Sequence, residues 1–269
     1  MKRLIIVLLV LLGVLVAVDY GAAAAAESAV SRQMRERLGL ADDPSVRING
    51  FPFLTQALSG EYRSVQVEAQ RVPVGQLRQV DVRAQLNDVT APLSELLGSG
   101  PKTLRVANAD GSVRVGTTDL EALLPGVRKL TIANLDANAL DALVRDGDAD
   151  PSLRGLDPET TARFGGTVAA LGQELDVAVV AELQILDGKM RIVPRDVRLG
   201  DVRLGDADAD PLPAPVQSLI ERLFTVQVDP GTLPFGVTPT KFRARDGELE
   251  LLGTAQNLVI GDGGAVTTG

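Results

Sequence analysis

The chain has 269 residues and a net charge of −8, and it contains no histidine and no cysteine. The two absences exclude Ser-His-Asp and Cys-His nucleophile systems and histidine-bearing zinc sites. The acidic charge argues against binding to nucleic-acid phosphates, and it requires any contact with an anionic membrane surface to be apolar, because both partners reward clustered lysine and arginine.

The N-terminus is typical of a secretory signal. Lys2 and Arg3 precede an apolar run of fifteen residues from Leu4 to Val18, and an alanine tract follows at 22–26. The run is shorter than the roughly 20 residues of a membrane-spanning helix, and the order basic, apolar, small is that of a signal peptide. We therefore expect an exported protein, with residues 1–26 either cleaved as a signal peptide or retained as an N-terminal anchor.

Most of the remaining chain alternates apolar and polar residues with a period of two, which predicts antiparallel strands with one buried and one exposed face. Three segments place Asp-Gly between alternating runs, at 106–115, 183–192 and 242–251. Asp-Gly favours a two-residue β-hairpin, because both central positions of a type I′ turn need positive φ. Each segment is predicted to be a hairpin, with these residues opposite each other: Val106 and Val115, Leu183 and Ile192, Phe242 and Leu251.

Four helices are predicted among these strands. One spans 26–38, one begins at the Thr118–Glu121 capping box, one begins at Asp157-Pro158, and one spans 213–224. The predicted fold class is α+β, mostly antiparallel β, in which the helices pack against amphipathic sheets. We expect a single domain over 27–260 and a disordered tail over 261–269.

Aspartates alternate in two predicted loops, as they do at the start of a calcium loop: Asp146, Asp148 and Asp150 in the first, and Asp206, Asp208 and Asp210 in the second. The glycine required at the sixth position is Pro151 or Pro211, and the glutamate of the twelfth is Asp157 or Gln217. We interpret both as solvated acidic turns, with a weak calcium site as the alternative, and expect no metal and no cofactor.

Aromatic residues are scarce, with six Phe, two Tyr and no Trp. The segments INGFPFL at 48–54 and LPFGVTPTKF at 233–242 both set proline beside phenylalanine ahead of predicted strands. Two interpretations stay open: the apolar residues of these segments either fill the core or line the opening of an elongated apolar cavity suited to a lipid-like ligand. The candidate lipid-binding residues are Phe51, Phe53, Leu54, Phe235 and Phe242.

Catalytic motifs are missing from the sequence. It has neither a Walker loop nor a G-x-G-x-x-G after a strand. With 35 Asp and Glu some carboxylate pair always lies at a glycosidase-like separation, but the aromatic platforms that usually stack sugars in such clefts are scarce. We therefore expect that the protein is not an enzyme.

The segments INGFPFLTQALSGEYRSVQVEAQ and LPFGVTPTKFRARDGELELLGTAQNLVI resemble the LmeA-like family of actinobacterial cell-envelope proteins, and the likeness runs over about residues 26–260. The resemblance implies an exported phospholipid-binding protein. It also implies a fold similar to the tubular lipid-binding (BPI-like, TULIP-like) class, with curved antiparallel sheet wrapped around helix. From mycobacterial relatives it implies an involvement in lipoglycan (mannan) elongation.

The expected function is thus non-catalytic phospholipid binding or lipid transfer in the cell envelope or periplasm. The expected partners are a phospholipid or other acyl lipid and the membrane surface, met through apolar contact or the N-terminal segment. One alternative is a membrane-tethered structural or protein-interaction β domain without a ligand cavity. A further alternative, an enzyme acting on envelope glycans, would need two facing carboxylates in a cleft.

Overall fold

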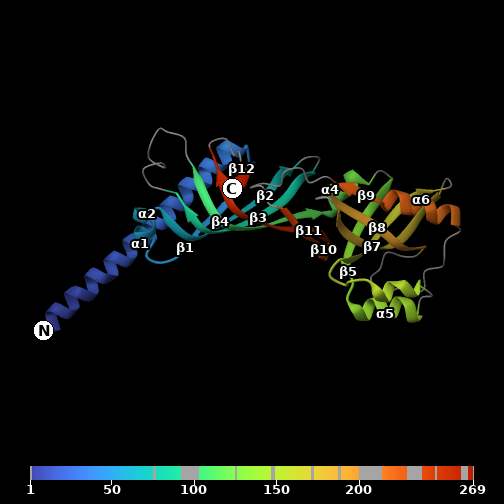
Figure 1. The fold of residues 1–269 in the computed structure, drawn as a ribbon, viewed down its shortest axis with the longest axis horizontal. Coiled ribbons are helices and arrows are strands. Elements are labelled where there is room, and N and C mark those ends of the chain that lie inside the picture. The colour runs from blue at the N-terminus through green and yellow to red at the C-terminus, as the bar shows by residue number, and fades with distance from the viewer. Residues whose placement is uncertain are drawn as a thin grey trace.

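A computed structural model describes residues 2–74, 77–91, 103–124, 126–146, 149–170, 173–186, 189–199, 214–228, 238–245, 247–261 and 266–268. Figure 1 shows a long N-terminal helix at one end, an elongated curled sheet in the middle and a smaller sheet at the other end. The fold is α+β with mostly antiparallel strands, as predicted.

The elongated sheet has seven antiparallel strands. Its order is β1 (Ser45–Asn49), β2 (Glu61–Val74), β3 (Leu77–Thr90), β4 (Leu104–Gly116), β11 (Glu248–Ile260) and β10 (Thr238–Arg245), with β12 (Val266–Thr268) paired to β11. The four central strands have 13 or 14 residues and are therefore about 45 Å long. This length exceeds the ~30 Å hydrocarbon core of a whole bilayer.

The smaller sheet has five antiparallel strands: β5 (Val127–Asn134), β6 (Thr161–Ala170), β7 (Gln173–Leu186), β8 (Lys189–Leu199) and β9 (Val226–Val228). It packs against β10, and the Gly247 N–H at the end of β10 donates to the Ile132 carbonyl on β5 at 2.8 Å. One buried apolar cluster runs through both sheets, from Val80 on β3 to Phe164 on β6. The two sheets therefore share a core.

Among the described residues, six helical segments accompany the sheets: α1 (Lys2–Leu38), α2 (Phe53–Ser59), α4 (Thr117–Leu123), α5 (Ala137–Asp146), the 3-10 turn η1 (Pro151–Gly155) and α6 (Ala214–Phe224). Helix α6 buries Val216, Ile220 and Phe224 against the five-stranded sheet, with the Phe224 and Phe164 rings 6.3 Å apart. Helix α4 is tied to β3, because the Asp119 carboxylate accepts the Gln79 N–H at 2.7 Å.

Two of the three predicted hairpins are confirmed with their register: Leu183 pairs with Ile192, and Phe242 with Leu251. The third prediction is wrong. Asp110 and Gly111 lie inside the continuous strand β4, which pairs with β3 on one side and β11 on the other. Neither is among the described residues with positive φ, whereas Gly247 in the confirmed β10–β11 turn has φ +82°. Pairing on both edges of β4 outweighs the local turn preference of Asp-Gly.

The predicted helices have mixed outcomes. Helix 213–224 is confirmed as α6, and 26–38 is the end of the much longer α1. No helix follows Asp157: its carboxylate accepts the Glu159 N–H at 2.9 Å in a turn that leads directly into β6. Residues 266–268, expected in a disordered tail, form β12. The Asp206–Asp210 loop lies outside the described residues.

Candidate functional site

One face of the seven-stranded sheet is apolar along its whole width. The register aligns its side chains in rows that cross five or six strands. A central row reads Val46, Val67, Ala84, Gly111, Gly253 and Pro239, and the row beside it Ile48, Val65, Leu86, Ala109 and Ala255. The middle strands β3, β4 and β11 contribute mainly alanine and glycine to these rows. The apolar face therefore carries its shortest side chains along its centre.

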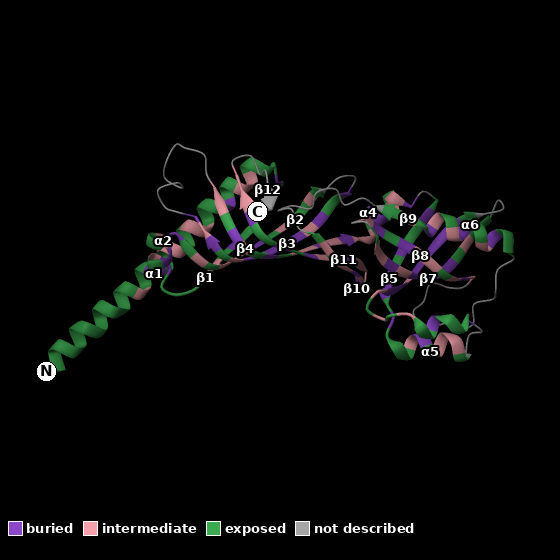
Figure 2. Cartoon of the chain, in the orientation of Figure 1, coloured by how far each residue is buried: buried purple, intermediate pink, exposed green. Residues whose placement is uncertain are grey.

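The opposite face of the same sheet is polar. Gln66 and Glu68 on β2 alternate with the apolar residues, and so do Arg83 and Gln85 on β3. Figure 2 shows this alternation of buried and exposed positions along the strands. On the apolar face, burial is weakest on β2, where Val65, Ala69 and Val72 are only half-buried. The apolar face is thus least covered along part of β2, next to the edge strand β1.

Helix α1 covers the free edge of β1. The Glu27 carboxylate accepts the Ile48 N–H at 2.7 Å, and the Ser31 hydroxyl donates to the Pro44 carbonyl at 2.5 Å. Further toward the N-terminus, the two oxygens of the buried Asp19 carboxylate accept the N–H groups of Phe53 and Leu54, each at 2.8 Å. These two N–H groups lie at the start of α2, where no intrahelical acceptor exists. Asp19 therefore fixes α2 to α1.

The turn before α2 explains the local sequence. Gly50 has φ +117°, a conformation that side-chain-bearing residues rarely adopt, and a Cβ at this position would lie 2.7 Å from the Gln56 side-chain nitrogen, so glycine is favoured. Gly60, with φ +71°, ends α2 in the left-handed conformation and returns the Gly60 N–H to the Gln56 carbonyl. The segment INGFPFLTQALSG is thus a compact turn and helix between β1 and β2.

The structure describes four of the five predicted lipid-binding residues and places them in different parts of the fold. Phe53 is buried and Leu54 is half-buried on α2, whereas Phe51 is exposed and its ring stacks on Tyr20 of α1 at 6.0 Å. Phe242 is buried on β10, at the opposite edge of the sheet from β1. Phe235 lies outside the described residues. The Phe51 turn and Phe242 therefore do not form one opening, and lipid contact by each residue stays a prediction.

Two features of this region were missed by sequence reasoning. The role of Asp19 and Tyr20 in the folded domain was not predicted, although an acidic and an aromatic residue inside a helical apolar segment could have indicated it. The small-residue row through Gly111 was also missed, because Asp110-Gly111 was interpreted as a turn.

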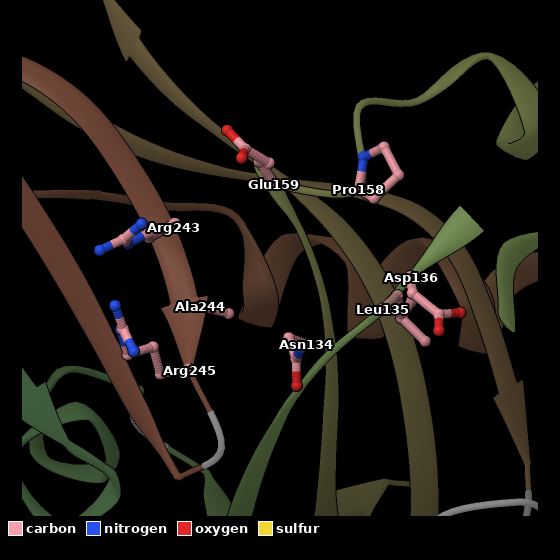
Figure 3. A pocket seen from close by; sticks show the side chains of 8 residues that line it. All are labelled: Asn134, Leu135, Asp136, Pro158, Glu159, Arg243, Ala244 and Arg245. Carbon is pink, nitrogen blue, oxygen red and sulfur yellow. The ribbon is translucent and has the colours of Figure 1, made fainter. Parts of the chain in front are cut away.

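A charged cleft of about 450 Å³ lies where β10 meets the five-stranded sheet (Figure 3). It is lined by Asn134, Leu135, Asp136, Pro158, Glu159, Arg243, Ala244 and Arg245. Its carboxylates already serve the fold, because Asp136 accepts the Ala139 N–H at the start of α5 and Glu159 pairs with Lys241. Its lining mixes charged side chains with Leu135, Pro158 and Ala244, and it is not the elongated apolar cavity of the second interpretation of the sequence.

Beside this cleft, the Glu250 carboxylate lies close to three arginine side chains on the polar face of the seven-stranded sheet. Its carboxylate accepts from Arg243 and Arg245 at 2.8 and 2.9 Å and lies 3.8 Å from Arg114. Burial alone would raise the pKa of Glu250, but the hydrogen bonds and charges of Arg245 and Arg243 outweigh it and lower the pKa. A carboxylate with a lowered folded pKa stabilises the protein above its unfolded pKa of about 4.3, and this stability is lost as pH falls through the folded pKa.

Glu250→Gln is therefore expected to lower the free energy of unfolding by about 2 kcal/mol at pH 7, because it leaves the arginines without their buried partner. The difference from the parent protein should shrink as the pH falls below about 4.3. Urea unfolding at a series of pH values measures it. The control is Glu248→Gln on the same strand, whose ion pair with Arg114 is more exposed and should cost much less. Equal losses in both variants at pH 7 would contradict the role assigned to Glu250.

Acidic residues do not cluster into a metal site: among the described residues, no group of three or more Asp and Glu could hold a metal ion. In the first of the two acidic loops, Asp150 instead accepts the Ser152 N–H at 2.8 Å, and this hydrogen bond lowers the pKa of Asp150.

One comparison with known proteins finds a match whose description fits the apolar face of the sheet. The family model described as LmeA-like phospholipid-binding matches residues 17–254. Searches of curated proteins and of solved structures give no match. Because the matched segment covers most of the chain, this protein belongs to the LmeA-like phospholipid-binding family.

Proposed function

We propose that this protein binds phospholipid non-catalytically by laying the acyl chains along the apolar face of the seven-stranded sheet. The observation that carries the proposal is the central row through Ala84, Gly111 and Gly253, which crosses the sheet in register. These short side chains lie beside a row of larger ones that contains Val82, Val113 and Leu251. Family membership supports phospholipid as the ligand.

The route of entry in this proposal is the β1–β2 edge. The half-buried side chains of Val65, Ala69 and Val72 lie there, whereas Val80 and Val115, in the same row as Val72, are buried in the shared core. Acyl chains would gain about 25 cal/mol per Å² of apolar surface removed from water. The net charge of −8 gives no general attraction for anionic head groups, so apolar contact supplies the affinity.

In this proposal the protein acts in the cell envelope. Helix α1 is long and apolar enough to cross a membrane by length and composition. We propose that the protein is exported and acts there as a lipid-transfer or lipid-presenting protein, and that its lipid binding supports lipoglycan elongation. The competing function, a tethered interaction domain with a filled core, predicts no lipid on the sheet.

The test is photo-crosslinking of the full chain in vesicles that contain a phospholipid with a diazirine on one acyl chain. Peptide mapping is essential, because α1 itself is expected to contact lipid. Adducts on the apolar positions of β1–β3 are the expected result, and native mass spectrometry of the detergent-extracted protein should show retained phospholipid. Adducts confined to α1 would contradict the proposal and favour the tethered domain.

A further inference from the structure

The first half of α1 presents an apolar surface that no described part of the protein covers. Its most apolar 18-residue window has a mean hydropathy of 2.7, and only 6% of that window is buried. A core helix of this composition would be mostly buried, since exposing it to water costs free energy on every turn. The segment therefore belongs either to a signal peptide or to a membrane anchor.

The second half of α1 decides between these two roles. It continues without a break to Leu38, and its side chains hold β1 and α2 through Glu27, Ser31 and Asp19. Cleavage after Ala26 would remove Asp19 and leave the N–H groups that start α2 without this acceptor. These N–H groups would turn to water, and α2 would lose its attachment to α1, while the contacts of Glu27 and Ser31 would stay. The attachment of α2 therefore favours the uncleaved helix.

Exposed apolar side chains lie on the elements that meet where α1 enters the domain. Tyr20 on α1 is 65% exposed, Phe51 in the adjoining turn is 53% exposed, and Leu58 on α2 is 78% exposed. Tyr20 and Phe51 stack on each other, although the chain has only eight aromatic residues. We call these three residues the collar. Aromatic rings at the end of an apolar helix are typical of the membrane–water interface.

The apolar run of α1 is shorter than the hydrocarbon core of a bilayer, and the collar lengthens the apolar surface. The fifteen residues from Leu4 to Val18 span about 22 Å, against a hydrocarbon core of about 30 Å. Lys2 and Arg3 can extend toward the head groups at one end. At the other end, the collar continues the apolar surface beyond Asp19, whose carboxylate is buried against α2 and shielded from lipid.

We propose that α1 is retained as a membrane anchor and that the collar of Tyr20, Phe51 and Leu58 lies in the interfacial layer of the bilayer. In this arrangement the apolar half of α1 lies inside the bilayer. The collar adjoins that half of the helix, so the surface that it contacts is lipid. Helix α2 and the β1–β2 edge are then held against the membrane. The idea that this placement helps lipid uptake rests on the proposed function. The contact between the collar and the bilayer does not depend on it.

The chain has no cysteine, so single labels can be placed without altering it otherwise. Leu58→Cys carries an environment-sensitive fluorophore on the collar, and Leu186→Cys carries it at the end of β7, where the leucine is also exposed, at 49%. The full chain with a C-terminal tag is expressed in an exporting bacterial host, its intact mass is measured, and it is reconstituted in phosphatidylethanolamine–phosphatidylglycerol vesicles.

The expected results are an intact mass that includes residues 1–26 and a blue-shifted Leu58→Cys label that is quenched several-fold more by nitroxide lipids than the Leu186→Cys label. An intact mass that lacks residues 1–26 would overturn the anchor. Equal quenching of the two labels, or quenching of neither, would overturn the collar. Loss of acyl-chain crosslinking to the sheet with intact quenching at Leu58 would refute the proposed function alone.

Discussion

Replacing Val65 with glutamate is expected to reduce phospholipid uptake at least tenfold while the protein stays folded. Val65 lies on β2, half-buried on the apolar face, between Ile48 and Leu86 in its row. An acyl chain laid over this row would have to desolvate the new carboxylate or force it to take up a proton. A tenfold loss corresponds to about 1.4 kcal/mol, which is modest for a charge facing hydrocarbon.

The matched control is Gln66→Glu. It adds the same charge at the next position of the same strand, but on the polar face, where Gln66 is exposed. Transfer of a fluorescent phospholipid from vesicles to the protein measures uptake, and circular dichroism with thermal unfolding measures folding. Uptake should fall in the Val65 variant and stay unchanged in the Gln66 variant. Equal effects of the two substitutions would show that global charge, and not the apolar face, governs uptake.

The period-two pattern predicted the faces of β2 over Val65–Ala69 and of β3 over Val80–Leu86 correctly, because alternation alone determines which side chains share a face. It could not predict which strands are neighbours. Asp110-Gly111 shows the reason: its local sequence favours a turn, and only the presence of β3 and β11, distant in sequence, makes a continuous strand more stable. The central row of short side chains on the apolar face follows from that long-range pairing and was invisible in the sequence.

The N-terminal region shows the same limit. Sequence reasoning identified the apolar run and left cleavage open, because the contact that bears on it joins Asp19 to Phe53 across 34 residues of chain. Phe51 and Phe53 were treated together for the same reason. They are two residues apart, yet α2 begins at Phe53 and turns its ring inward, while Phe51 stays on the turn outside.

Phe53→Ser is expected to lower the free energy of unfolding by about 3 kcal/mol, whereas Phe51→Ser should lower it by about 1 kcal/mol or less. Phe53 is 7% exposed, so its replacement removes a buried ring and places a hydroxyl there. Phe51 loses only its stacking on Tyr20. Urea unfolding of both variants gives the two values, and similar losses would contradict the placement of the two rings.

This difference separates the two interpretations of the INGFPFL segment. Phe53 is a core residue, so any loss of lipid uptake in Phe53→Ser should follow the loss of folded protein. Phe51 lies in the proposed collar, so Phe51→Ser should weaken the protection of α2 at the bilayer in hydrogen exchange while the sheet stays folded. If Phe51→Ser instead left α2 protection unchanged in vesicles, the stacking on Tyr20 would be a local packing contact and the interface would depend on Tyr20 and Leu58 alone.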